Sequence, residues 1–185
     1  MALLDLDYRV ARDALLGYAR ATAIVPLPGR PQWTNWVVDP EGPESEHNLA
    51  PEDMPGLLYT VYKRSHDPVL VSALVDSVKF ADGCMAETMS CILADLARYY
   101  PRALLTEMAH RDKSTWLWVS ELAITEIELD KPPQKVFPRL VHIAATPGDP
   151  LRAAARRLLA NMTRYQTEAR HRIAQGRAAK EQKGR

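Results

Sequence analysis

The sequence predicts an all-α fold, and two observations carry this prediction. After Pro55, apolar side chains recur at steps of three and four residues almost to the end of the chain, which is the period of an amphipathic helix. No segment shows a convincing alternation of apolar and polar residues, which a half-buried strand would require. A short stack of helix pairs or an irregular helical bundle would each satisfy this pattern.

The first expected helix covers residues 3–23 and should end before Pro26, because proline cannot continue a helix. The following segment, 24–55, contains seven prolines, so it cannot form a long helix. We expect a long, proline-rich acidic loop here. Loops of this length in compact domains are usually functional or disordered.

Seven further helices are expected, each located by an apolar stripe and a start or stop signal. Asp67–Pro68, for example, combines an N-cap acid with a proline at the first helical position. Pro101, Pro132–Pro133 and the Pro147–Pro150 turn should end helices. The expected helices cover residues 57–62, 69–80, 84–99, 104–108, 116–129, 136–145 and 151–175.

Three aspartates mark a weak internal repeat. Asp67, Asp112 and Asp149 each follow a short expected helix and precede a longer one, and they lie 45 and 37 residues apart. A period of about 40 residues is typical of solenoids built from two-helix units.

The clearest unit, 138–159, resembles a HEAT repeat. It has an apolar helix, a turn aspartate, and an apolar-Arg-x-Ala-Ala start to its second helix, formed by Asp149, Leu151, Arg152, Ala154 and Ala155. The units at 56–80 and 103–129 match less well, and the helix at 84–99 interrupts the array. The resemblance implies a short HEAT-like α-solenoid with a binding surface and no catalytic set. The alternative is an irregular helical bundle.

Length, charge and cysteine content limit the possible classes of protein. The 185 residues fit one helical domain over 1–175 with a basic, disordered tail over 176–185. The formal net charge of +1 excludes a generally basic nucleic-acid binder. Two cysteines, an acidic start and the lack of a long apolar run together predict a soluble cytoplasmic protein without a membrane segment.

Motifs for metal or cofactor binding are absent from the sequence. The five histidines include no pair at ligand spacing, and there is no Cys-x-x-Cys and no glycine-rich phosphate loop. Cys84 and Cys91 share a helix face, where packing or exposure explains them better than a metal does. Glu126 falls on the apolar side of its helix, so we expect an ion pair, with Arg139 as candidate, rather than a general acid or base. We therefore predict no cofactor, no metal and no catalytic residue.

The predicted binding site lies in the loop. Trp33 and Trp36 precede a segment without Lys or Arg, and tryptophan is favoured at binding hot spots. The acids of this segment would steer a basic partner, while the alternative is that both indoles fold back as a lid over helix ends. The six acids are Asp39, Glu41, Glu44, Glu46, Glu52 and Asp53.

These features favour a non-catalytic protein–protein binding module, such as an adaptor, a chaperone-like protein or an immunity-type protein that neutralises a basic toxin. A first alternative is a nucleic-acid-associated protein, because residues 163–185 carry seven Lys and Arg against two Glu. A solubilising end explains the same charge. A second alternative is a small helical enzyme that uses Glu126, Asp95 or Cys91.

Overall fold

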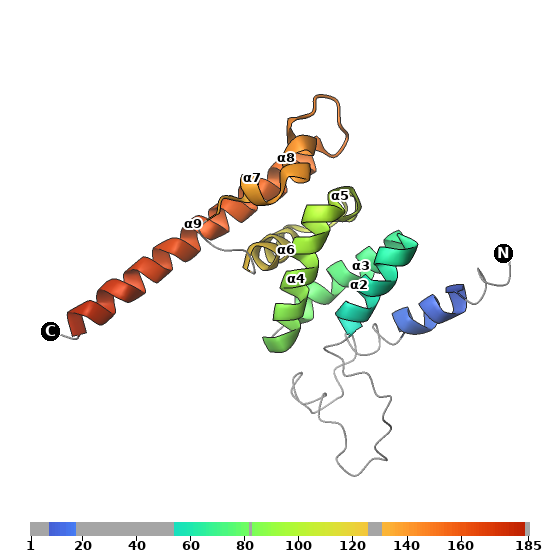
Figure 1. The fold of residues 1–185 in the computed structure, drawn as a ribbon, viewed down its shortest axis with the longest axis horizontal. Helices are drawn as coiled ribbons and strands as arrows, with labels where there is room; N and C mark the ends of the chain where they lie inside the picture. Colours follow the sequence, from blue (N-terminus) through green and yellow to red (C-terminus); the bar gives the residue numbers. More distant parts are fainter. Residues whose placement is uncertain (1–7, 18–53, 82, 126–130, 184–185) are drawn as a thin grey trace, which may run out of the picture.

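Helices form all the regular secondary structure in the part of the chain that the structure, a computed structural model, describes: residues 8–17, 54–81, 83–125 and 131–183. Over these ranges nine α-helices and one 3-10 helix pack into a bundle without strands (Figure 1). The predicted all-α class is confirmed. Most of the expected loop, 24–53, lies outside the described residues.

The helices follow one another with short connections. The first covers residues 8–17 and lies within the expected range 3–23. The others are α2 (Met54–Ser65), α3 (Pro68–Ser77), the 3-10 helix η3 (Val78–Phe80), α4 (Gly83–Tyr99), α5 (Pro101–Met108), α6 (Lys113–Thr125), α7 (Pro133–Val136), α8 (Pro138–Ala145) and α9 (Arg152–Lys183).

Helix α4 lies at the centre of the bundle, where it packs against α2, α5, α6 and α8. Helix α9 packs against α5, α6, α7 and α8 along its first half and then projects away from the other helices (Figure 1). None of the described helices is both long and apolar enough to cross a membrane.

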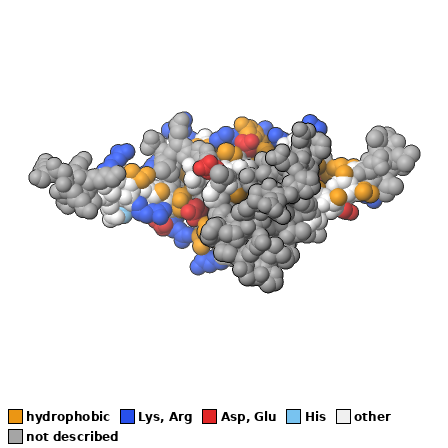
Figure 2. Space-filling model, turned by 90° about the horizontal axis from the view of Figure 1, so that it is seen from below, with side chains coloured by type: hydrophobic (Ala, Val, Ile, Leu, Met, Phe, Trp, Pro, Cys, Tyr) orange, Lys and Arg blue, Asp and Glu red, His pale blue; other side chains and the backbone are white. Residues whose placement is uncertain are grey.

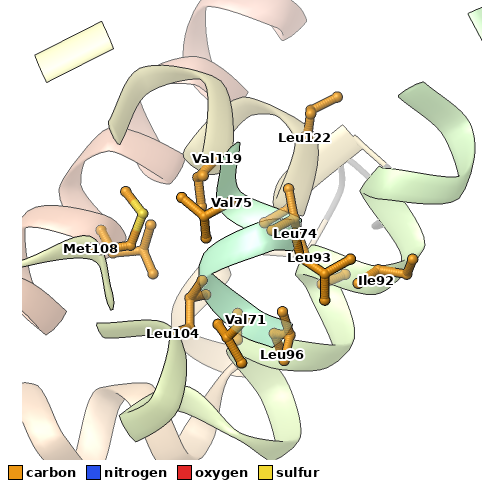
Figure 3. Packing of buried hydrophobic residues seen from close by; sticks show 14 of the residues in the cluster. Val71, Leu74, Val75, Ile92, Leu93, Leu96, Leu104, Met108, Val119 and Leu122 are labelled. Carbon is orange, nitrogen blue, oxygen red and sulfur yellow. The ribbon is translucent and has the colours of Figure 1, made fainter. Parts of the chain in front are cut away.

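The core gathers apolar side chains from the helix at 8–17, from α2 to α6, and from α8 and α9. Leu74 of α3, Leu93 of α4 and Val119 of α6 are completely buried and point toward one another (Figure 3). Trp116 and Phe137 are the largest of the fully buried side chains. Because these residues come from helices spread over the whole described chain, the core joins them into one packed unit.

The three predicted turn aspartates each hold the start of a helix. The side chain of Asp67 accepts a hydrogen bond from the Val69 amide at 3.0 Å. Asp112 accepts one from the Thr115 amide at 2.7 Å, and Asp149 accepts one from the Leu151 amide at 2.9 Å. These contacts satisfy amides that the first helical turn leaves unpaired, so the predicted turns are confirmed.

Each of these aspartates also meets a basic side chain from an earlier element. Arg12 lies 3.0 Å from Asp67, Lys79 lies 3.9 Å from Asp112, and Arg102 lies 2.5 Å from Asp149. The turns are therefore tied to the preceding part of the bundle as well as capped.

Several predicted helix boundaries are wrong. The expected helix 136–145 begins only at Pro138, as α8, and Val136 ends a separate short helix, α7. The two helices are separated at Phe137 (φ −117°, ψ 63°). The reason is Pro138, which disfavours helical backbone at the residue before it and begins a new helix itself.

Two further boundaries lie beyond the expected ones. Helix α9 continues to Lys183 instead of ending near Gln175, because residues 178–183 are mostly alanine, lysine, glutamate and glutamine, all good helix formers. Helix α2 begins at Met54, so the expected loop ends before Pro55, and both residues are buried. A proline is tolerated there because the first helical turn needs no amide donor from it.

Candidate functional site

An open groove of about 620 Å³ lies where the C-terminal half of α2, the junction of α4 and α5, and α8 come together. The described residues that line it are aromatic, apolar and basic, and none of them is acidic. The lining residues are Tyr62, Tyr99, Tyr100, Pro101, Arg102, Ala103, Pro138, Arg139, His142 and Ile143.

Packed aromatic rings make one wall of the groove rigid. The rings of Tyr62 and Tyr100 meet edge to face with their centroids 5.3 Å apart. The His66 ring packs against both, at 5.8 Å from Tyr62 and 5.7 Å from Tyr100. Burial raises the pKa of the Tyr62 hydroxyl.

His66 takes up this position through its backbone. Its φ of 53° places it in the left-handed region, and its amide donates to the Tyr62 carbonyl at 2.8 Å. This is the usual way to end a helix, although glycine or asparagine more often fills the position. The end of α2 thereby turns the imidazole toward the two tyrosines.

Two arginines give the groove its basic character, and both are held in place. Arg139 donates from Nη1 to the Tyr99 carbonyl at 2.8 Å. Arg102 donates from Nη2 to Asp149, whose pKa is lowered by the Leu151 amide and by Arg102 itself. His142 follows Arg139 by three residues on α8 and so lies on the same side of that helix. A guanidinium has five N–H groups, so each arginine has donors besides those used in these contacts.

Both arginines belong to the same short sequence. Tyr100–Pro101–Arg102 begins α5, and Phe137–Pro138–Arg139 begins α8. In each, proline occupies the first helical turn and places the arginine directly after it. Sequence reasoning missed this groove, and the repeated aromatic–Pro–Arg tripeptide is the signal that could have indicated it.

The structure does not place the site residues predicted from the sequence. Trp33, Trp36 and the six acids, Asp39, Glu41, Glu44, Glu46, Glu52 and Asp53, all lie outside the described residues, as does Glu126. Arg139, the expected partner of Glu126, is among the residues that line the groove.

The remaining candidates for chemistry are dispersed. Asp95 accepts a hydrogen bond from the Tyr59 hydroxyl at 3.3 Å, and burial together with this carboxylate raises the pKa of Tyr59. The side chain of Cys91 is exposed. Among the described residues, no group of three or more His, Cys, Asp or Glu side chains is arranged to hold a metal ion.

No family model matches the chain, and no curated protein or solved structure matches it. The resemblance to HEAT repeats therefore identifies no family, and the chain is placed at the level of an all-helical protein. Its function has to be argued from the groove and from the charge on its surface.

Proposed function

We propose that this chain is a non-catalytic protein-binding module and that the groove receives a segment of its partner. The observation that supports this is the lining, in which tyrosine, arginine and proline side chains surround an open volume of about 620 Å³. Tyrosine and arginine are among the residues that carry most binding energy at protein interfaces. An adaptor, a chaperone-like protein or an immunity-type protein would each use such a surface.

The size and stiffness of the groove suit a short segment of chain. Ligand pockets commonly enclose about 300–1,000 Å³, so this volume accepts a few residues rather than a folded domain. The packed Tyr62 and Tyr100 rings and the anchored Arg139 lose little freedom on binding, because neighbouring groups already hold them.

Two sequence features extend the proposal. A HEAT-like organisation of 138–159 would suit binding, because helix-pair stacks use their curved surfaces to hold partners, and α8 of this unit lines the groove. Trp33, Trp36 and the acids between Asp39 and Asp53 would add a second contact, to a basic surface of the partner.

Photo-crosslinking in the native host tests the proposal with a matched control. A photoreactive amino acid replaces Tyr99, which is 48% exposed and lines the groove, or Trp118, which is 46% exposed and lies on α6. We expect a discrete crosslinked protein from position 99, none from position 118, and loss of the crosslink when Ala103→Phe fills the groove. Equal crosslinking at both positions, or none at position 99, would contradict the proposal.

A second candidate function, nucleic-acid binding, is favoured by the projecting half of α9. Between Thr167 and Arg177 every side chain is exposed except the half-buried Ala169, and Arg170, Arg172 and Arg177 lie in this stretch. Basic side chains stand along this end of the molecule, at the left of Figure 2. A gel shift over a salt series tests it: binding through phosphate contacts weakens steeply with salt, and the alternative fails if no shift is seen at low salt.

A further inference from the structure

We infer that the segment received by the groove is acidic and extended, with Asp or Glu side chains interleaved with apolar ones. The inference rests on the proposed function, because it gives the chemistry of the partner in the same groove. The contact expected at residues 39–53 is with a basic surface of the partner, so the two contacts differ in charge and can be separated by experiment.

Charge complementarity is the first argument. Among the described residues, the groove is lined by Arg102, Arg139 and His142 and by no Asp or Glu. The nearby acid, Asp149, has a side chain only 5% exposed, whereas the Arg102 side chain that it contacts is 61% exposed. The carboxylate thus faces the protein and the guanidinium faces solvent, which leaves the mouth of the groove positive.

The second argument is that both guanidiniums are already oriented. The Tyr99 carbonyl fixes Arg139 at 2.8 Å, and Asp149 fixes Arg102 at 2.5 Å. An arginine that is held in this way can form a two-point contact with a carboxylate at little further cost in entropy. Because the two arginines start different helices, they would bind separate carboxylates of one segment.

The third argument concerns the apolar part of the lining, to which Pro101, Pro138 and Ile143 contribute. An apolar side chain that alternates with the carboxylates of the segment would contact these residues and gain the free energy of leaving water. A purely acidic segment would make no such contact, so alternation of the two residue types fits the lining best.

A single-stranded nucleic acid also combines negative charge with flat apolar groups, but the tyrosines do not suit it. Bases stack on free aromatic faces. Here Tyr62 and Tyr100 are engaged edge to face with each other, and the Arg98 guanidinium lies 5.8 Å above the Tyr99 ring. The rings therefore act as walls, which favours a peptide over a strand of bases.

Fluorescence anisotropy with the full chain tests the inference. The probe is a labelled peptide of repeated Glu-Leu-Glu-Ala, and the matched probes carry Gln or Lys in place of Glu. We expect the acidic probe to bind more tightly than the Gln probe and to bind more weakly as the salt concentration increases. The Lys probe should not bind. Arg102→Gln and Arg139→Gln should each lower the affinity for the acidic probe about tenfold, which is the effect of losing one charge-assisted contact.

Arg164→Gln is the matched control, because it removes the same charge from α9, outside the groove. Within the described part of the chain, Arg139 donates to the Tyr99 carbonyl and forms no ion pair. Arg139→Gln therefore keeps the test valid even if loss of the Arg102–Asp149 pair disturbs the turn. Circular dichroism verifies the fold of each variant.

Three outcomes would overturn the inference. The first is equal binding of the Glu and Gln probes, the second is no binding of the acidic probe, and the third is tighter, Arg139-dependent binding of a single-stranded oligonucleotide. If the Glu and Gln probes bind equally but Ala103→Phe still abolishes their binding, the inference about charge fails while the proposed function stands. The proposed function itself fails if position 99 gives no specific crosslink.

Discussion

Trp116 and Trp118 lie two residues apart on α6 and test which face of this helix is packed against the core. Trp116 is 2% exposed, and the Arg157 guanidinium of α9 lies 4.5 Å over its ring. Trp118 is 46% exposed. The two substitutions Trp116→Ala and Trp118→Ala remove the same side chain from the same helix, so their difference isolates burial.

We expect Trp116→Ala to lower the free energy of unfolding by about 3–5 kcal/mol, the usual cost of removing a buried tryptophan. A buried aromatic side chain hides roughly 200 Å², which at about 25 cal/mol per Å² gives an upper value of about 5 kcal/mol. Loss of the contact with Arg157 adds about 0.5–1 kcal/mol at most. Trp118→Ala should cost less than about 1 kcal/mol, as exposed positions usually do.

Urea denaturation followed by far-UV circular dichroism measures both values, and equal m-values would show that the unfolded states are comparable. For a chain of this size each kcal/mol shifts the melting temperature by about 2–4 °C, so Trp116→Ala should lower it by about 6–20 °C. Equal losses for the two variants, or a larger loss for Trp118→Ala, would show that α6 is rotated from the position described. The reasoning about the core would then be refuted.

Three other variants test the turn at Asp67 and the projecting end of α9. Asp67→Ala should cost about 0.5–2 kcal/mol, because it removes the cap on Val69, while Asp67→Asn should cost less because it keeps the cap. Burial alone would raise the pKa of Asp67, but hydrogen bonds from Arg12 and the Val69 amide lower it overall. The stability advantage of Asp67 over Asn should therefore hold above about pH 4 and disappear as the pH falls through the folded-state pKa of Asp67. A pH-independent difference in thermal melts would contradict this. Truncation after Gln175 should leave the melting temperature within a few degrees, because Gly176 and Arg177 are exposed, and a larger loss would show that this end docks.

The fold class could be predicted because its signals are local. Helical spacing of apolar residues and the aspartates at 67, 112 and 149 act within one or two turns, and the structure contains those turns. The same local signals failed at two prolines, because a proline can either end one helix or begin the next. Pro133 and Pro138 were expected to end or lie within helices, whereas each begins one.

The groove could not be predicted, because it depends on which helices become neighbours. Its walls come from residue 62, residues 99–103 and residues 138–143, which periodicity assigns to helices without saying how these helices pack. Tyr99 illustrates this: it continues the helical spacing of the buried Met89, Ile92 and Leu96, yet it is 48% exposed at the groove. Periodicity locates a buried face, but at the last turn of α4 the neighbouring helix no longer covers it.

Asp149 belongs both to a turn that the sequence predicts and to the surroundings of the groove, which the sequence does not predict. The spacing of the turns selected it as a structural residue, and its hydrogen bond from the Leu151 amide agrees. The same carboxylate also holds Arg102, which belongs to the groove through the first aromatic–Pro–Arg sequence. Stability of the turn before α9 and orientation of a groove cation therefore depend on one side chain. The helix cap at Asp149 can be recognised from the sequence, whereas its role in positioning the Arg102 guanidinium arises only when folding brings residue 102 beside it.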